Sequence, residues 1–524
     1  MGKKIELEIP DPKHLEAMRS RIIDKQLQDE DCPILVNMID AYGHLAEKLA
    51  KQEQTIKKYQ HMIFDPKGEK SKDILPPTDQ PADPEPKKEP PAGHGRMKPD
   101  DYPDAERHCI CHITIQSGQL CPSCKRGKVY RWKQPQVLVR IKGNKLFTPE
   151  IYELERLRCN LCGEFFTAEQ PAHVGREKYD ASAVSMIVLM KYGTGMPFYR
   201  LDKFTETLGV PMPAATQWDI VDFAADHFED IYASMIRHAA MGDLFHNDDT
   251  PVKIMELKRN IYLKKISGMD PPRRTGIYTS SIISKVGEQK IALYYSSHSH
   301  AGENLAKVLR HRPINLDPPL QMCDGKSENV PRDFATILSN CLAHARRKFV
   351  EIYDNFPDEC RHVIEMFKFV YAHDAETKDK MLTPAQRLEH HKTYSRPILD
   401  RFKEWFEDKF QKKLIEPNSN LGQAIHYMQK RWTAMIRFTE VEGAPLDNNI
   451  CERALKKAIL SRKNSYFYKS VRGAKVGDLF MSLIHTCELN KINPFDYFNA
   501  VLNNKEKVHS NPANWTPLNY QLQL

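Results

Sequence analysis

The stretch FHNDDTP at residues 245–251 decides our interpretation of the fold. It ends an apolar run and places two adjacent carboxylates, Asp248 and Asp249, directly before a proline. Around it, residues 241–325 contain short runs rich in β-branched and aromatic residues, which predict four or five strands. Helical patterns precede these strands and return at residues 331–440. Strands flanked by helices indicate an α/β catalytic core interrupted by a helical insertion.

Two more carboxylates have comparable surroundings. Asp324 ends the run LQMCD and is followed by Gly325, and Glu452 lies in DNNICER at residues 447–453, where a helix cap is expected. Carboxylates at strand ends lie where an α/β sheet places its active site, and their oxygens suit Mg²⁺ or Mn²⁺. Two such ions can activate water and stabilise the leaving oxygen in phosphodiester cleavage. Each carboxylate taken alone is more typical of a solvated turn or a helix cap.

Length and composition limit the class of protein. A chain of 524 residues predicts about three to five domains, and 41% hydrophobic with 28% charged residues is typical of a soluble globular protein. No apolar run approaches the ~18 residues of a membrane span, and the first residues contain no apolar secretory signal. We therefore expect a cytoplasmic protein.

The net charge of +8 is unevenly distributed. Residues 451–480 contain eight Lys or Arg side chains against two acidic ones, Glu452 and Asp478. A local excess of this kind is typical of a surface that binds a polyanion.

Twelve cysteines are present, six of them between residues 109 and 162. Without a secretion signal, clustered cysteines indicate a metal site rather than disulfides. Two CxxC pairs predict one closed tetrahedral zinc site in a zinc ribbon, with an extended hairpin expected in the spacer at residues 129–143. Its predicted ligands are Cys121, Cys124, Cys159 and Cys162. A second site is an open alternative, formed by His108, Cys109, Cys111 and His112.

The N-terminal part is expected to be helical. At residues 35–63 apolar side chains recur in steps of three and four, which predicts a dimeric coiled coil or, alternatively, an amphipathic helix packed on its own domain. Nine prolines in residues 75–105 predict an extended linker. The helical patterns of residues 178–240 are compatible with helix-turn-helix DNA binding and equally with an ordinary helical subdomain. The last helix of the chain is expected to start near Pro494.

Several of these motifs resemble those of the transposases of the insertion-sequence 66 family. HNDDTPV, LQMCDG and CLAHARRKF at residues 341–349 resemble its two aspartate motifs and its C-W-A-H-x-R-R-K-F signature. The text from DNNICER to NPFDYF resembles its C-terminal block, and the two CxxC pairs match its zinc-binding domain. The chain departs from the pattern at Asp249, where the family usually has Glu, and at Leu342, where it has Trp.

The resemblance implies a ribonuclease-H-like core of the DDE type, with Asp248, Asp324 and Glu452 as catalytic residues and magnesium ligands. The implied activity is DNA transposition, which is metal-dependent strand cleavage at the ends of a mobile element followed by strand transfer. Basic side chains are expected to contact the DNA, namely His344, Arg346, Arg347, Arg453, Arg462 and Lys463.

The resemblance implies as partners the element ends, the target DNA, a second copy of the chain in a homodimer or higher homo-oligomer, and helper proteins encoded by the element. It also implies a nucleoid-associated location in a bacterium. A catalytically decayed or domesticated zinc-containing DNA-binding protein is the alternative function. A metal-dependent nuclease without strand transfer is a third.

Together these patterns predict a multidomain protein of α/β and α parts, with a ribonuclease-H-like core, a helical insertion, a zinc ribbon and an N-terminal coiled coil. The expected domains are a helical region at 1–64, a proline-rich linker at 65–105, a zinc-binding domain at 106–170, a helical DNA-binding region at 171–240, the first part of the core at 241–344, the insertion at 345–440, the C-terminal core helices at 441–510 and a tail at 511–524.

Overall fold

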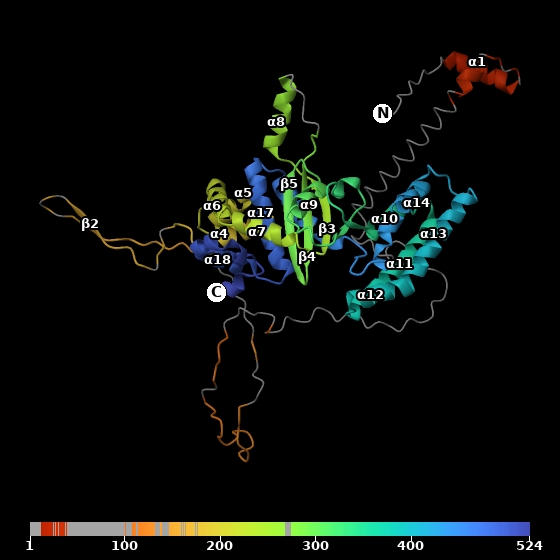
Figure 1. Ribbon diagram of the computed structural model, residues 1–524. Coiled ribbons are helices and arrows are strands. Elements are labelled where there is room, and N and C mark those ends of the chain that lie inside the picture. The colour runs from red at the N-terminus through yellow and green to blue at the C-terminus, as the bar shows by residue number, and fades with distance from the viewer. Residues whose placement is uncertain are drawn as a thin grey trace. The chain divides into compact units, whose positions relative to one another are not determined.

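The computed structural model describes residues 12–38, 107–131 and 146–175 with short gaps, residues 100, 137 and 138, and residues 177–267 and 274–524 (Figure 1). The chain divides into two compact units. The first, here called the helical unit, contains residues 1–77, 320–325 and 337–448, and the second, here called the core unit, contains residues 78–319, 326–336 and 449–524.

Little of the N-terminal region is described. The helix α1 (Pro12–Ile23) is followed by helical residues at 31–36, and the buried Asp31 accepts hydrogen bonds from the Arg21 guanidinium at 2.9 and 2.7 Å. The proline-rich linker and most of the expected coiled-coil seam lie outside the described residues, so both stay predictions.

Three antiparallel strands organise the core unit. They are β3 (Leu244–Pro251), β4 (Tyr278–Val286) and β5 (Gln289–Ser297). A two-residue turn joins β4 to β5, and Gly287 in this turn has φ +58°, a conformation that glycine adopts without strain. In the register between β3 and β4, Asp248 lies opposite Ser281.

The helix α17 (Val471–Leu489) satisfies the exposed backbone of β5. Four polar side chains, spaced four residues apart from Asp478 to Asn490, bond to alternate backbone N–H groups of the strand. The pairs are Asp478 with Ser296 (2.6 Å), Ser482 with Tyr294 (2.9 Å), Thr486 with Ala292 (3.0 Å) and Asn490 with Lys290 (3.1 Å). Because unpaired strand groups are costly when buried, this ladder both closes the edge and fixes α17 in register.

Helices cover both faces of these strands (Figure 1). On one face α16 (Asn449–Ser465) packs against β3 and β4, and on the other lie α7 (Glu229–Ala239) and α9 (Ala301–Leu309). The same hydrophobic core includes side chains of α4 (Ala181–Val188), the π-helical turn η2 (Leu189–Gly193), α5 (Phe198–Thr207), α6 (Ala214–Asp226), α18 (Pro494–Asn503) and α19 (Lys505–Ser510). The start of α18 at Pro494 confirms the expectation from the sequence.

Residues 511–524 also belong to this core. They form the short 3₁₀ helices η6 (Pro512–Trp515) and η7 (Tyr520–Gln523), and Trp515 and Tyr520 are buried. The expected tail is therefore packed on the unit.

The pair α5 and α6 has the length expected of a helix-turn-helix, but its surroundings favour the ordinary subdomain. Asp219, Phe223 and Asp226 are exposed along α6, and Arg472 at the start of α17 bonds to three carboxylates of α6 and α7. An acidic exposed face repels DNA phosphates. DNA binding by residues 171–240 stays a prediction.

The helical unit contains two parallel strands and a bundle. The strands β6 (Leu320–Cys323) and β7 (Ile337–Asn340) pair in parallel, and α10 (Leu342–Val350) follows β7 directly. The other helices are α11 (Pro357–Asp379), α12 (Pro384–His390), the π-helical η4 (His391–Ser395), α13 (Arg396–Gln411), α14 (Asn420–Lys430), α15 (Trp432–Met435) and the 3₁₀ turn η5 (Arg437–Thr439). Aromatic contacts join them, such as Phe367 with Phe402 at 5.5 Å between ring centroids.

The chain is thus a mixed α/β protein, compatible with a ribonuclease-H-like core. Two expectations about its elements were wrong. Residues 255–266 form the helix α8 (Met255–Ile266) instead of strands, and β7 lies in a stretch that we expected to be helical. None of the α8 side chains is buried. The aliphatic residues that we had expected in a buried strand therefore lie at the surface of a helix. Four residues of β7 are too few to show an alternating pattern. Among the described residues no helix is both long and apolar enough to cross a membrane.

Asp478 makes the stability of the core unit depend on pH. Burial raises its pKa to about 7, although the hydroxyl and the backbone N–H of Ser296 both donate to it. The folded state therefore keeps a proton that the unfolded chain releases near pH 4, and the free energy of unfolding falls as the pH rises from about 4 to 7. Above pH 7 both states are ionised and this contribution stays constant.

We expect Asp478→Asn to remove this fall, because the amide keeps an oxygen for the Ser296 N–H and carries no charge. The variant should match the wild type near pH 4 and be more stable at pH 8 by about 2–4 kcal/mol, as measured by urea unfolding. The exposed Asp408→Asn serves as the control and should leave the pH profile unchanged. If the free energy of unfolding of Asp478→Asn and of the wild type depended on pH in the same way, Asp478 would have an ordinary pKa in the folded protein.

Candidate active site

Asp248 and Asp249 point to opposite faces of β3, since successive side chains of a strand alternate. The Asp249 carboxylate accepts hydrogen bonds from His300 Nδ1 at 2.8 Å and from the Ala301 N–H at 3.3 Å. It therefore lies at the N-terminus of α9, where the backbone N–H groups favour a negative charge. Asp249 fixes α9 against the strand.

Asp248 lies on the face of β3 that α16 covers. It is 8% exposed, and its Oδ1 accepts hydrogen bonds from the Asp249 N–H at 2.8 Å and from Asn329 Nδ2 at 3.3 Å. Asn329 ends the 3₁₀ turn η3 (Ser327–Asn329) and is itself accessible to no solvent. The carboxylate is thus oriented by a buried amide.

The first turn of α16 brings Glu452 into the neighbourhood of Asp248. Cys451, the preceding residue, is buried and donates its thiol to the Ser281 carbonyl at 3.4 Å. Ser281 is the cross-strand partner of Asp248 in the β3–β4 register. One turn further, Tyr294 of β5 donates its hydroxyl to the Ala454 carbonyl at 2.8 Å. Two of the three predicted carboxylates therefore come from adjacent elements of one unit.

Asp324 belongs to the helical unit, where it follows β6 and is 5% exposed. Its carbonyl accepts a hydrogen bond from the Tyr427 hydroxyl at 2.7 Å, and burial raises the pKa of Tyr427 to about 12, which keeps this donor protonated. Gly325 has φ +83°, its carbonyl accepts from Arg431 Nε at 2.9 Å, and a Cβ there would lie 2.7 Å from that nitrogen. The turn after Asp324 therefore requires glycine.

The predicted DNA-binding residues differ in exposure. On α10, Arg346 is buried at 9% exposure, whereas His344 and Arg347 are half-buried. On α16, Arg453, Lys456 and Lys463 are exposed, and their spacing places them on one face of the helix. Here this set is called the basic stripe.

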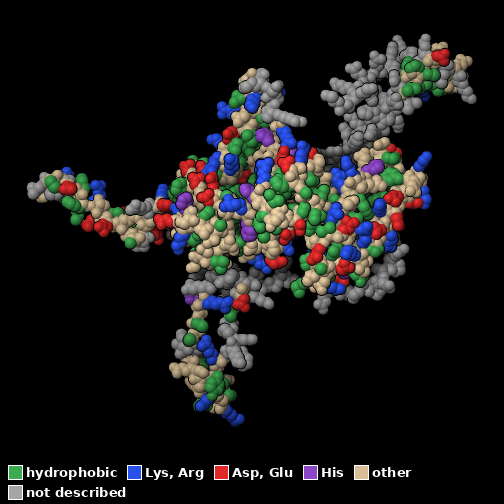
Figure 2. Space-filling model, viewed as in Figure 1, with side chains coloured by type: hydrophobic (Ala, Val, Ile, Leu, Met, Phe, Trp, Pro, Cys, Tyr) green, Lys and Arg blue, Asp and Glu red, His purple; other side chains and the backbone are tan. Residues whose placement is uncertain are grey.

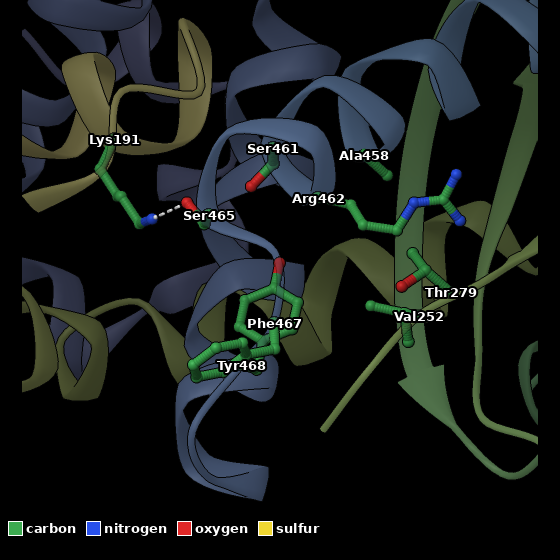
Figure 3. A pocket seen from close by; sticks show the side chains of 9 residues that line it. All are labelled: Lys191, Val252, Thr279, Ala458, Ser461, Arg462, Ser465, Phe467 and Tyr468. Atoms are coloured by element: carbon green, nitrogen blue, oxygen red, sulfur yellow. Dashed lines mark hydrogen bonds between the residues drawn. The ribbon is translucent and has the colours of Figure 1, made fainter. Parts of the chain in front are cut away.

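Arg462 has a different role in the structure. Its guanidinium bonds to Thr250 Oγ1 at 3.1 Å and to the Pro251 carbonyl, so it ties α16 to the end of β3. It also lines a small pocket beside that strand end (Figure 3).

One residue of this pocket was missed by our sequence analysis. Lys191, on η2, is 9% exposed and donates to Ser465 Oγ at 2.9 Å. Burial lowers the pKa of Lys191 to about 8. The signal was a single lysine inside the apolar run SAVSMIVLMKYG, which we had interpreted only as a helix.

With this geometry established, the chain was compared with known proteins. The family model described as "Transposase IS66 family" matches residues 176–476, more than half of the chain. The chain belongs to this family. The matched range contains all three predicted carboxylates, and the resemblance inferred from the sequence is confirmed.

Curated relatives of this transposase-family protein come from Sinorhizobium fredii (strain NBRC 101917 / NGR234). The chain is similar to the uncharacterized protein y4hP, with 26% identity over 376 residues that cover 66% of the chain and 63% of that protein. It is also similar to the uncharacterized protein y4jD, with 25% identity over 329 residues that cover 60% of each. The alignments thus span about three fifths of the length of these relatives.

The cysteine pairs of the transposase-family chain lie before the matched range. The first forms a tight turn between Leu120 and Lys128, in which the Cys121 N–H donates to the Gly127 carbonyl at 2.7 Å. Hydrogen bonds from the Gly127 and Arg126 backbone hold the pKa of Cys124 below its ordinary value. N–H groups aimed at sulfur stabilise a thiolate, which is the form that binds metal.

The second pair follows the same pattern as far as it is described. The strands β1 (Arg156–Arg158) and β2 (Phe165–Thr167) pair antiparallel, and the second CxxC occupies the connection between them. Cys162 is exposed, whereas Cys159 and most of the hairpin expected at 129–143 lie outside the described residues. The four-thiolate zinc site stays a prediction.

Proposed function

We propose that this transposase-family protein cuts DNA at the ends of its mobile element and joins the freed ends to target DNA. The observation that carries the proposal is the first turn of α16, where Cys451, the residue before Glu452, contacts the cross-strand partner of Asp248. Membership of a transposase family supports the reaction class. The catalytic residues in this proposal are Asp248, Asp324 and Glu452.

The donor chemistry of these residues fits Mg²⁺ or Mn²⁺. All three side chains offer carboxylate oxygens, which are the ligands that hard divalent ions prefer. Asp248 and Asp324 are each largely buried, and a bound cation would balance the charge of an ionised carboxylate at such low exposure. A divalent ion held there would supply positive charge to the attacked phosphate and lower the pKa of the attacking water.

In the proposed first step, a water oxygen forms a bond to phosphorus and the phosphorus–O3′ bond breaks, which leaves a 3′-hydroxyl on the element end. In the second step that hydroxyl attacks a target phosphodiester, and the O3′ of the target strand leaves with the proton. Asn329 and the β3 backbone hold Asp248 in place throughout. Tyr427 and Arg431 hold the turn that carries Asp324.

Exposed basic side chains of the core unit support DNA as the partner. The basic stripe starts directly after Glu452 on α16. The helix α8 also exposes basic residues, and Figure 2 shows blue side chains over this helix. Its exposed basic residues are Lys258, Arg259, Lys264 and Lys265. We assign non-specific phosphate contacts to these side chains, together with His344 and Arg347 of α10. The buried Arg346 and the engaged Arg462 position their helices, and the proposed zinc ribbon and coiled coil add end recognition and pairing of subunits.

The test is a cleavage assay with the purified full-length chain and a duplex of the element's own end. With Mg²⁺ we expect a nick at the element boundary that is absent with EDTA and with a scrambled end sequence. Binding of the end without any metal-dependent nick would favour the non-catalytic DNA-binding protein. Nicking without joining to a target duplex would favour a nuclease.

A further inference from the structure

The pocket beside the end of β3 is built around a buried lysine. Lys191 enters it from η2, and Figure 3 shows its amine pointing to Ser465 at the end of α16. The other lining residues are Val252, Thr279, Ala458, Ser461, Arg462, Phe467 and Tyr468. All of them belong to the core unit.

Lys191 lacks a counter-charge within the described part of the chain. Its one hydrogen-bond partner there is a neutral hydroxyl, and the rings of Phe198 and Tyr192, whose centroids lie 5.1 and 6.0 Å from the amine, carry no net charge. A buried ammonium without a carboxylate is costly, and proteins usually provide a partner. An anion that enters from solvent would supply the missing charge.

The size of the pocket limits which anion can reach Lys191. Its volume is about 30 Å³, more than the roughly 10–15 Å³ that one water molecule needs on this measure, so a small polar group fits. It has no room for a base or a sugar, but the oxygens of a phosphoryl group can reach the ammonium. Hydroxyl donors suit the same oxygens, and Ser461 and Ser465 provide them.

The rim indicates that the phosphate belongs to a nucleic acid. Tyr466 is 70% exposed and Phe467 is 48% exposed, and exposed Lys463 and Lys469 flank them. Aromatic side chains interleaved with lysines bind nucleic acid by stacking on bases and by neutralising phosphates. The basic stripe connects this rim to Glu452 along α16.

We propose that Lys191 and Ser465 bind one backbone phosphate of the element-end DNA, with Tyr466 and Phe467 against the adjoining nucleotide. This inference rests on the proposed function. Thirteen residues of α16 separate Glu452 from Ser465, about 20 Å at 1.5 Å per residue. At about 3.4 Å per nucleotide of one strand, the bound phosphate lies roughly six nucleotides from the cleaved bond.

The decisive variant is Lys191→Met in the full-length chain, because methionine keeps the length and removes the charge. We expect its affinity for end DNA to fall by about tenfold to a hundredfold, and the slope of log K against log salt to decrease by about one. Its Tm at pH 7 should equal or exceed that of the wild type, since an uncompensated buried charge is lost. A residue with a purely structural role would instead lose Tm and keep its affinity.

The matched control is Lys307→Met. Lys307 also bonds to a serine hydroxyl, at 3.3 Å, but it lies on α9 on the other face of the strands. It should bind DNA within about twofold of the wild type. Ser465→Ala removes only the partner hydroxyl and should lower affinity about threefold to tenfold, and it provides the test if Lys191→Met does not fold.

Binding is measured without divalent ions, so failure of the proposed cleavage does not affect the result. Wild-type affinity in Lys191→Met, or in Ser465→Ala where the first variant is unfolded, would overturn the inference. Inorganic phosphate distinguishes the sources of the ligand. If millimolar phosphate raises the Tm of wild type but not of Lys191→Met, while DNA affinity is equal in both, the pocket binds free phosphate and the DNA assignment is wrong.

Discussion

Asp248→Asn and Glu452→Gln each lower the rate of end cleavage by about a thousandfold or more, while both variants still bind the end DNA. Loss of one ligand oxygen weakens the charge stabilisation that a bound metal would give to the attacking and leaving oxygens. A thousandfold decrease in rate corresponds to an increase of about 4 kcal/mol in the activation free energy. Binding instead depends on phosphate contacts by basic groups, which neither variant removes. Single-turnover cleavage at saturating DNA separates the two effects. Asp324→Asn is expected to behave in the same way.

Asp249 provides the internal control for these variants. Its carboxylate is engaged with His300 and the N-terminus of α9, so Asp249→Asn should keep cleavage within a few-fold and lose about 1 kcal/mol of stability. If Asp249→Asn abolishes cleavage and Asp248→Asn does not, the first ligand is assigned one position too early. If all of these variants cut like the wild type, the triad is wrong and the non-catalytic DNA-binding protein becomes the better explanation.

The sequence predicted the elements that carry the candidate residues, because these residues lie near the ends of a strand and a helix, where cap and turn residues mark the boundaries. Asp248 in a strand before a proline, and Glu452 in the first turn of a helix, were located correctly by cap and turn residues. The sequence left the choice between Asp248 and Asp249 open, since alternation along a strand tells only that the two side chains point to opposite faces. The contact of Asp249 with His300 shows which face α9 occupies.

Other features were hidden because the sequence signal is ambiguous. The α17 ladder appears as four polar residues in an apolar helix, and nothing local shows that they meet the backbone of β5. Lys191 was missed because one lysine in an apolar helix usually extends its amine to solvent. Only packing of η2 on the end of α16, with Asn464 donating to the Gly195 carbonyl at 3.1 Å, encloses it.

Replacing Cys121 or Cys124 with Ser is expected to reduce bound zinc from about one ion per chain to a small fraction. In the described turn the Cys121 N–H donates to the Gly127 carbonyl, and backbone hydrogen bonds lower the pKa of Cys124, which favours the thiolate that binds metal. Among the described residues of the surrounding segment, Ile110, Leu120 and Tyr130 are exposed, so these side chains add nothing to a hydrophobic core. Metal binding would therefore supply most of its folding free energy, which amounts to about 10 kcal/mol or more in small zinc domains.

Zinc content by atomic emission and limited proteolysis check this prediction together. Cys121→Ser should make residues 107–167 protease-sensitive and leave the Tm of the hydrophobic core around β3, β4 and β5 unchanged, because the packing of α17 on these strands needs no thiolate. Cys32→Ser is the control, since Cys32 is exposed and lies far along the chain from both CxxC pairs. Cys109→Ser tests the alternative site upstream of the first CxxC pair. If this variant loses as much zinc as Cys121→Ser, the upstream His and Cys residues hold the ion. Wild-type protein purified with much less than one zinc per chain would exclude the four-thiolate site and leave the two turns as ordinary hairpins.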